Sequence, residues 1–197
     1  MHIYRRQGAF LPHWTADGAT YSVTFRLADA LPLQARQQLK QIRDEATRTI
    51  AGNPSMRERI DIARVMHRRL DDLLHSGNGS CIFNDPTLAD LMLQTMTHFD
   101  GVRFSLLAWT VMPNHVHAVI RPLRDCSLPS IIHGWKSFSS HMIGRRTGNG
   151  GRVWQSEYFD HLIRGPEDLH QSIEYVVSNP IVAGLVNWRW AGKKSSG

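Results

Sequence analysis

VRFSLLAWTVMPNHVHAVIR, residues 102–121, is the stretch that decides the fold of this chain. Its first half, residues 102–112, is almost wholly apolar and predicts a strand that is covered on both faces near the centre of a sheet. Residues 115–121 predict a second strand. Because only Pro113 and Asn114 separate the two strands, they are expected to form an antiparallel hairpin.

Outside this hairpin the sequence alternates between strand and helix patterns. Residues 19–27, ATYSVTFRL, predict another strand, and residues 152–164 predict mixed extended structure. Asp85 is expected to cap a helix that begins at Pro86, and Pro180 is expected to end the last helix. The predicted helices cover residues 33–52, 56–75, 86–99, 128–146 and 166–179. The pattern predicts an α+β fold with an antiparallel sheet.

Composition limits the class of protein. The chain has 197 residues, 42% hydrophobic and 20% charged, which fits one globular domain over residues 1–190 and a disordered tail over 191–197. No apolar run reaches the roughly 18–20 residues of a membrane span, and no signal peptide is evident. Cys81 and Cys126 lack metal or redox spacing and are expected to be reduced thiols in the cytoplasm.

The positive charge is uneven along the chain. The formal net charge is +6, and residues 101–197 carry 11 Lys and Arg against 6 Asp and Glu. Positive charge of this kind suits a polyanion, because each neutralised phosphate releases counterions. From charge alone, a protein that binds nucleic acid and a basic protein that binds no polyanion are equally expected.

His115 and His117 are the first chemical signal. Side chains alternate along a strand, so both imidazoles point to one face about 7 Å apart, while Val116 points to the core. Two imidazoles on one face can bind a single metal ion and leave other coordination positions open. Paired histidines on an exposed sheet face often bind nothing, so the pattern needs a third ligand and a reacting group.

The last predicted helix supplies both. Tyr175 and Asn179 are four residues apart and lie on one face of the helix, beside an apolar stripe. A tyrosine oxygen can attack a phosphodiester, and an amide oxygen can complete a site for Mg²⁺ or Mn²⁺ with the two histidines. The alternatives are a packing tyrosine and an ordinary helix C-terminus before a proline.

Several motifs in this order resemble one known family, the REP-associated tyrosine transposases of the single-tyrosine HUH endonuclease superfamily. They are YSVTFRL at 21–27, WTVMPNHVHAVIRP at 109–122, Trp154-Gln155 with YFDHLIR at 158–164, and Glu167-Asp168 with YVVSNPIVAGLV at 175–186. The resemblance implies a ferredoxin-like antiparallel sheet with helices packed on it. It also implies cleavage of single-stranded DNA beside a hairpin through a 5′-phosphotyrosine intermediate.

By the same resemblance, Tyr175 is the nucleophile and His115, His117 and Asn179 hold the divalent metal, Mg²⁺ or Mn²⁺. Tyr158 is the rival nucleophile, but it lies in an extended stretch without a partner at helical spacing. Residues 34–75 form a helical segment that compact members of the family lack. The protein is expected to be a monomer or homodimer, cytoplasmic and nucleoid-associated, without a membrane.

Residues that contact phosphates and stack on bases are expected around these motifs. Taken one at a time, each basic residue fits an ordinary surface charge equally well, and the tryptophan fits a core position. The predicted DNA contacts are Arg5, Arg6, Lys136, Arg145, Arg146, Arg152, Trp154, Gln155 and Arg164.

Two alternative functions stay open. One is a protein of the same fold that grips DNA or RNA hairpins without cutting them, for which a metal site would be unnecessary. The other is a hydrolase that uses the two histidines and an activated water, which would want a nearby carboxylate as general base.

Overall fold

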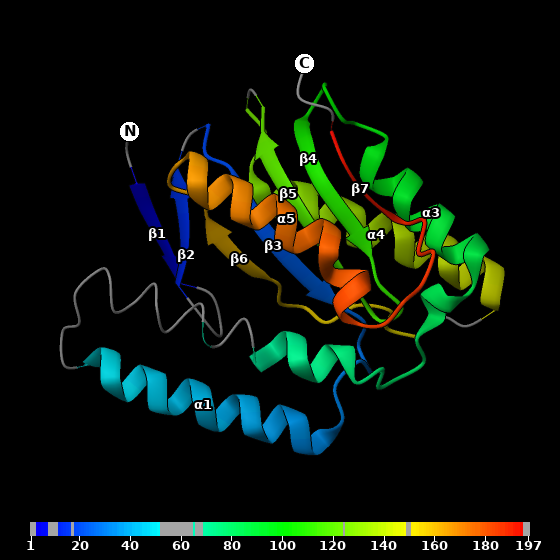
Figure 1. Cartoon of the computed structure of the whole chain (residues 1–197), viewed down its shortest axis with the longest axis horizontal. Helices are drawn as coiled ribbons and strands as arrows, with labels where there is room; N and C mark the ends of the chain where they lie inside the picture. Colours follow the sequence, from blue (N-terminus) through cyan, green and yellow to red (C-terminus); the bar gives the residue numbers. More distant parts are fainter. Residues whose placement is uncertain are drawn as a thin grey trace. The chain divides into compact units, whose positions relative to one another are not determined.

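A computed structural model describes residues 3–7, 12–16, 18–51, 65, 69–123, 125–148 and 151–194 (Figure 1). The chain divides into two compact units. One unit combines Met1–Ala28 with Ile82–Gly197, and the other is Asp29–Cys81.

The first unit is built on a five-stranded sheet in which every neighbouring pair is antiparallel. Its strands lie in the order β6-β3-β5-β4-β7, so the predicted hairpin of β4 and β5 lies at the centre. A separate antiparallel pair joins β1 and β2. The strands are β1 (Ile3–Gln7), β2 (Pro12–Ala16), β3 (Tyr21–Arg26), β4 (Phe104–Val111), β5 (His115–Pro122), β6 (Phe159–Leu162) and β7 (Ala191–Lys193).

Helices cover both faces of this sheet. In Figure 1, α5 crosses one face, whereas α3 and α4 lie behind the other. The connectivity β3-α3-β4-β5-α4-β6 is ferredoxin-like, which confirms the predicted fold class. The helices of this unit are η1 (Ile82–Asn84), α3 (Pro86–Thr97), α4 (Leu128–Thr147) and α5 (Pro166–Val182).

The local signals for these elements behave as expected. The Asp85 carboxylate accepts a hydrogen bond from the Thr87 amide at 2.8 Å, so Asp85 caps α3 with Pro86 in the first turn. The side chains of β5 are buried from His115 to Ile120, as expected for a central strand with helices on both faces. On the α3–α4 side, the core packs aromatic rings, with Phe25 4.9 Å from Trp154 and 6.2 Å from Trp135 between centroids.

The second unit contains α1 (Leu33–Ala51) and a helical stretch over residues 69–75, in keeping with the predicted helical segment. The part of the expected helix over residues 56–75 that precedes residue 69 lies largely outside the described residues. The two ends of the unit meet, because the Ser80 amide donates to the Asp29 carboxylate at 2.8 Å. Gly79 adopts φ +88°, and a Cβ there would lie 2.6 Å from the Asp29 carbonyl oxygen.

Two boundary predictions are wrong. Pro180 does not end the last helix, which continues to Val182. The tail expected to be disordered from residue 191 forms β7 over Ala191–Lys193, because the outer edge of β4 offers backbone groups for it to pair with. Gly192 allows this approach, since a Cβ there would lie 2.7 Å from the Trp109 ring. Residues 195–197 lie outside the described residues.

Among the described residues, no helix is both long and apolar enough to cross a membrane.

Candidate metal centre and tyrosine

His115 and His117 meet on the face of the sheet that α5 covers. Both lie in β5, two residues apart, and both are buried. Their Nε2 atoms are 2.9 Å apart, and their rings are nearly perpendicular. Across the sheet, His117 pairs with Thr24 of β3 and Thr110 of β4. The predicted pairing of two imidazoles on one strand face is therefore present, in a buried rather than an exposed position.

The outer nitrogen of each imidazole has a polar partner. His115 Nδ1 lies 2.7 Å from Asn114 Oδ1, and His117 Nδ1 lies 2.7 Å from the Thr24 hydroxyl. Because a carbonyl oxygen only accepts, His115 donates from Nδ1 and keeps the lone pair on Nε2. Histidines that bind metals are usually oriented in this way by a second partner. Neither Asn114 nor Thr24 was predicted from the sequence as a site residue.

These atoms fit a divalent cation. A cation bound to both Nε2 atoms at about 2.1 Å and at a right angle would separate them by about 3.0 Å, close to the observed 2.9 Å. No cluster of three His, Cys, Asp or Glu side chains suited to a metal occurs in the described part of the chain, so another protein ligand would come from an amide or hydroxyl. Asn179 is an amide, and it is 1% exposed on α5.

Tyr175 lies against this pair. Its ring centroid is 5.6 Å from that of His117, in an edge-to-face arrangement. The side chain is half-buried, one helical turn before Asn179. The rival Tyr158 lies before β6, where the Lys136 ammonium is 5.7 Å from its ring centroid. The described contacts therefore bring Tyr175 to the histidines.

Thr110 fixes the segment of α5 that carries Tyr175. Proline has no N–H, so Pro180 leaves the Val176 carbonyl without its usual helical donor. The buried Thr110 hydroxyl donates to that carbonyl instead, which explains how the helix continues through the proline. At the other end of α5, the Asp168 carboxylate lies 2.9 Å from His161 Nε2 on β6. The sheet thus holds α5 at both ends.

Thr110→Val should lower the free energy of unfolding by about 1–3 kcal/mol, because a buried carbonyl loses its donor. In the double variant with Pro180→Ala, most of that loss should disappear, since residue 180 regains an N–H for the Val176 carbonyl. Urea unfolding of the wild type, both single variants and the double variant measures this coupling. Strictly additive effects would contradict the account.

Three residues expected to contact DNA make hydrogen bonds within the protein. Trp154 is 4% exposed, and its indole N–H donates to the Ser139 hydroxyl at 2.9 Å, so its ring is not available to a base. The Gln155 side chain donates to the Ala28 carbonyl. Lys136 donates to the carbonyls of residues 155, 156 and 157 at 2.9–3.2 Å, which uses its three N–H donors. For Trp154 the DNA-contact prediction is corrected, and for Gln155 and Lys136 it stays a prediction.

Burial, together with the charges of Arg26 and Arg152, lowers the pKa of Lys136 to about 8, against the opposing effect of Glu157. At pH values between this pKa and the ordinary pKa of a lysine, Lys136 is protonated in the unfolded chain and deprotonated in the folded chain. Stability must therefore rise with pH in that window.

The free energy of unfolding of the wild type, relative to Lys136→Met, should increase by about 1–2 kcal/mol from pH about 7.5 to about 9.5. Urea unfolding at both pH values measures it. A pH-independent difference would show that the Lys136 ammonium is not destabilised by burial.

The other predicted DNA contacts remain candidates. Arg145, Arg146, Arg152 and Arg164 are exposed, and Arg5 and Arg6 lie in β1, although their side chains are outside the described residues. Arg26 was missed by the sequence analysis, and it pairs with His115 across β3 and β5. It lies in the motif YSVTFRL, which contributed to the strand prediction and to the family resemblance but not to the predicted site residues.

Comparison with known proteins bears on this site. Residues 82–179 match the family described as "Transposase IS200 like", just under half of the chain, and the match contains both histidines and Tyr175. A REP-associated tyrosine transposase of Escherichia coli strain K12 is 29% identical over 84 residues, which cover 42% of this chain and 48% of that protein. Over these residues the chain is similar to these transposases. The resemblance predicted from the sequence is thus confirmed.

The likeness extends over the fold. A solved structure of a REP-associated tyrosine transposase bound to a REP hairpin covers 97% of this chain and 82% of that chain, with a TM-score of 0.54 at 17% identity. At this identity the comparison shows a shared fold. The matched part of this chain spans about half of the length of the curated relatives, between 48% and 57%.

Proposed function

We propose that this chain is a metal-dependent single-strand DNA endonuclease and strand transferase of the HUH type, acting at hairpin-forming repeats through a covalent 5′-phosphotyrosine. The observation that carries the proposal is the Tyr175 ring lying against His117, whose Nε2 converges with that of His115 at 2.9 Å. A protein that only binds hairpins has no need for two buried imidazoles turned toward each other beside a tyrosine.

In this proposal His115, His117 and Asn179 would hold Mg²⁺ or Mn²⁺, and the bound ion would supply neutralisation of charge on the scissile phosphate. The Tyr175 oxygen attacks phosphorus, and the bond from phosphorus to the 3′ oxygen breaks. The phenolic proton passes to solvent, and the released 3′ oxygen takes up a proton to become a hydroxyl. Attack by a 3′-hydroxyl on the phosphotyrosine runs the same exchange in reverse and joins a new strand.

The hydrogen-bond partners of the two imidazoles favour this role over that of a hydrolase with an activated water. Each outer nitrogen is held by a neutral group, Asn114 or Thr24, rather than by a carboxylate. A hydrolase would need a general base beside the metal. Tyr175 lies beside His117, where a hydrolase would need that general base.

The proposed substrate is single-stranded DNA with a hairpin. It is supported by the names of the relatives and by the hairpin bound to the structural neighbour. The exposed Arg145, Arg146, Arg152 and Arg164 and the net charge of +6 suit phosphate contacts. We propose that the protein acts on this DNA as a monomer or as a homodimer.

A denaturing gel tests the proposal. The purified chain is incubated with Mn²⁺ and a labelled pool of hairpin oligonucleotides with randomised single-stranded flanks, then heated in detergent. We expect a slow, heat-resistant protein–DNA band that disappears with EDTA. A hairpin that shifts on a native gel but never forms this band would instead favour the non-cleaving binder.

A further inference from the structure

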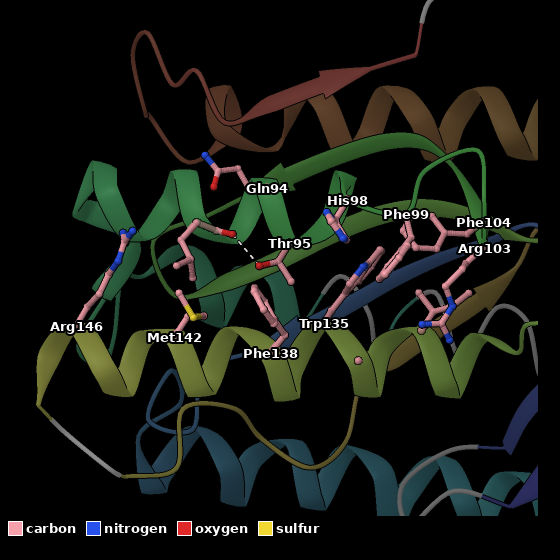
Figure 2. Close-up of a pocket in the computed structure, with 13 residues that line it drawn as sticks. Gln94, Thr95, His98, Phe99, Arg103, Phe104, Trp135, Phe138, Met142 and Arg146 are labelled. Atoms are coloured by element: carbon pink, nitrogen blue, oxygen red, sulfur yellow. Dashed lines mark hydrogen bonds between the residues drawn. The ribbon is translucent and has the colours of Figure 1, made fainter.

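A cavity of about 460 Å³ lies between α3 and α4, on the face of the sheet opposite α5 (Figure 2). We call it the α3–α4 pocket. Its volume falls within the ~300–1,000 Å³ typical of ligand sites. Since Tyr175 and the histidines lie on the α5 side of the sheet, nothing in the proposed chemistry uses this pocket.

Aromatic rings form much of its wall. Phe104 and Trp135 meet edge to face with centroids 5.2 Å apart at the floor. Phe99 and Phe138 line the pocket as well, and they are 42% and 54% exposed. Figure 2 shows Phe138 projecting from α4 beside Trp135. Exposed apolar side chains gathered at a cavity often mark a binding site, and two phenyl rings suit a flat ligand.

The pocket also contains a hydrogen-bond donor without an acceptor. Trp135 is 4% exposed, and its Nε1 atom is buried with no hydrogen-bond partner among the described residues. In Figure 2 its indole nitrogen points into the pocket, toward His98. The indole N–H groups of Trp154, Trp188 and Trp190 all find acceptors at 2.7–2.9 Å. A buried N–H that faces a cavity is a position for a ligand acceptor.

The charges at the pocket are of one sign. Arg103 and Arg146 line it, and none of the residues lining it is Asp or Glu. The Arg103 guanidinium is 5.4 Å from the Phe99 ring centroid, and Arg146 is exposed at the end of α4. An apolar, flat interior between two guanidinium groups matches a base with its flanking phosphates.

We propose that the α3–α4 pocket takes one unstacked base of a single DNA strand, with an acceptor on the base edge meeting the Trp135 N–H and Arg103 and Arg146 meeting its phosphates. The inference rests on the proposed function for its choice of DNA. A second copy of this chain fits less well, since each copy carries a net charge of +6 and brings the same arginines. The pocket would fix which part of the strand is held, away from the reacting phosphate.

Binding without chemistry tests this. In a Tyr175→Phe background, fluorescence anisotropy with labelled hairpin oligonucleotides compares Phe138→Ala and Trp135→Phe with the matched surface control Val186→Ala, a residue 84% exposed. Phe138→Ala should weaken binding about tenfold, equivalent to about 1.4 kcal/mol, and the control should not. Trp135→Phe should also weaken binding, because it removes the unpaired indole N–H. It removes buried ring volume as well, so a thermal melt checks that the variant is folded at the assay temperature.

Abasic substitutions in the DNA identify the base. One abasic position should reproduce the loss seen with Phe138→Ala, and combining the two should add nothing further. If no abasic position couples to Phe138→Ala, or if this variant changes only the oligomeric state in size-exclusion chromatography, the inference is overturned. A wild type that forms no covalent band, with base-dependent binding at Phe138 intact, would overturn the proposed function and leave this inference standing.

Discussion

Tyr175→Phe is expected to abolish the covalent protein–DNA band completely, while Tyr158→Phe leaves it at the level of the wild type. Tyr175→Phe removes the phenolic oxygen that is the proposed nucleophile. It keeps the ring, whose centroid is 5.6 Å from that of His117. The denaturing gel with Mn²⁺ and the hairpin pool measures both variants. Native-gel binding by Tyr175→Phe should stay unchanged, which separates lost chemistry from lost recognition.

Tyr158→Phe is the matched control, because it removes one phenolic hydroxyl from a residue next to the same sheet. Its ring lies by Lys136, which holds the backbone of residues 155–157. A band lost only in Tyr158→Phe would transfer the nucleophile to that residue. A band lost in both variants would mean that neither hydroxyl alone accounts for the reaction.

His117→Ala is expected to lower both Mn²⁺ affinity and cleavage by more than about a hundredfold. Loss of an outer partner of a metal-bound histidine typically costs about 10–100-fold, so loss of the histidine itself should cost more. Asn114→Ala should then fall between His117→Ala and the wild type, because Asn114 holds the ring of His115 at 2.7 Å. Calorimetric titration with Mn²⁺ measures affinity, and the gel assay measures cleavage.

The control for His117 is His133→Ala, which removes an exposed histidine of α4 on the other side of the sheet. It should bind Mn²⁺ as the wild type does. Circular dichroism checks that His117→Ala remains folded. Undiminished Mn²⁺ affinity in folded His117→Ala would place the metal elsewhere and would remove the main support of the proposed mechanism.

Much of the fold could be predicted because its signals are local. The alternation around His115 and His117 assigns both to one face, and the two residues between the strands impose the hairpin. The cap of α3 depends only on Asp85 and its neighbours. The spacing of Tyr175 and Asn179 along one helix is likewise a local property.

The rest depends on contacts between distant segments. Thr24 and Thr110 flank His117 only through the register of β3 and β4 with β5, which no spacing within one segment reveals. Pro180 was expected to end α5 because proline lacks an N–H. The helix continues because the Thr110 hydroxyl of β4 replaces the missing donor, and the local sequence of α5 does not reveal that contact. Trp154 lies within a family motif, yet it is buried against Phe25 and Phe83 from elsewhere in the chain.

The hydrogen bond between Asp29 and Ser80 has a consequence for how this architecture can vary. It holds together the two ends of the Asp29–Cys81 unit, so the chain leaves the sheet unit after Ala28 and re-enters it at Ile82. Connections closed in this way tolerate changes of length at small entropic cost. A change in the length of the helical unit is therefore expected to leave β3 and α3, and with them the geometry of His115, His117 and Tyr175, in place.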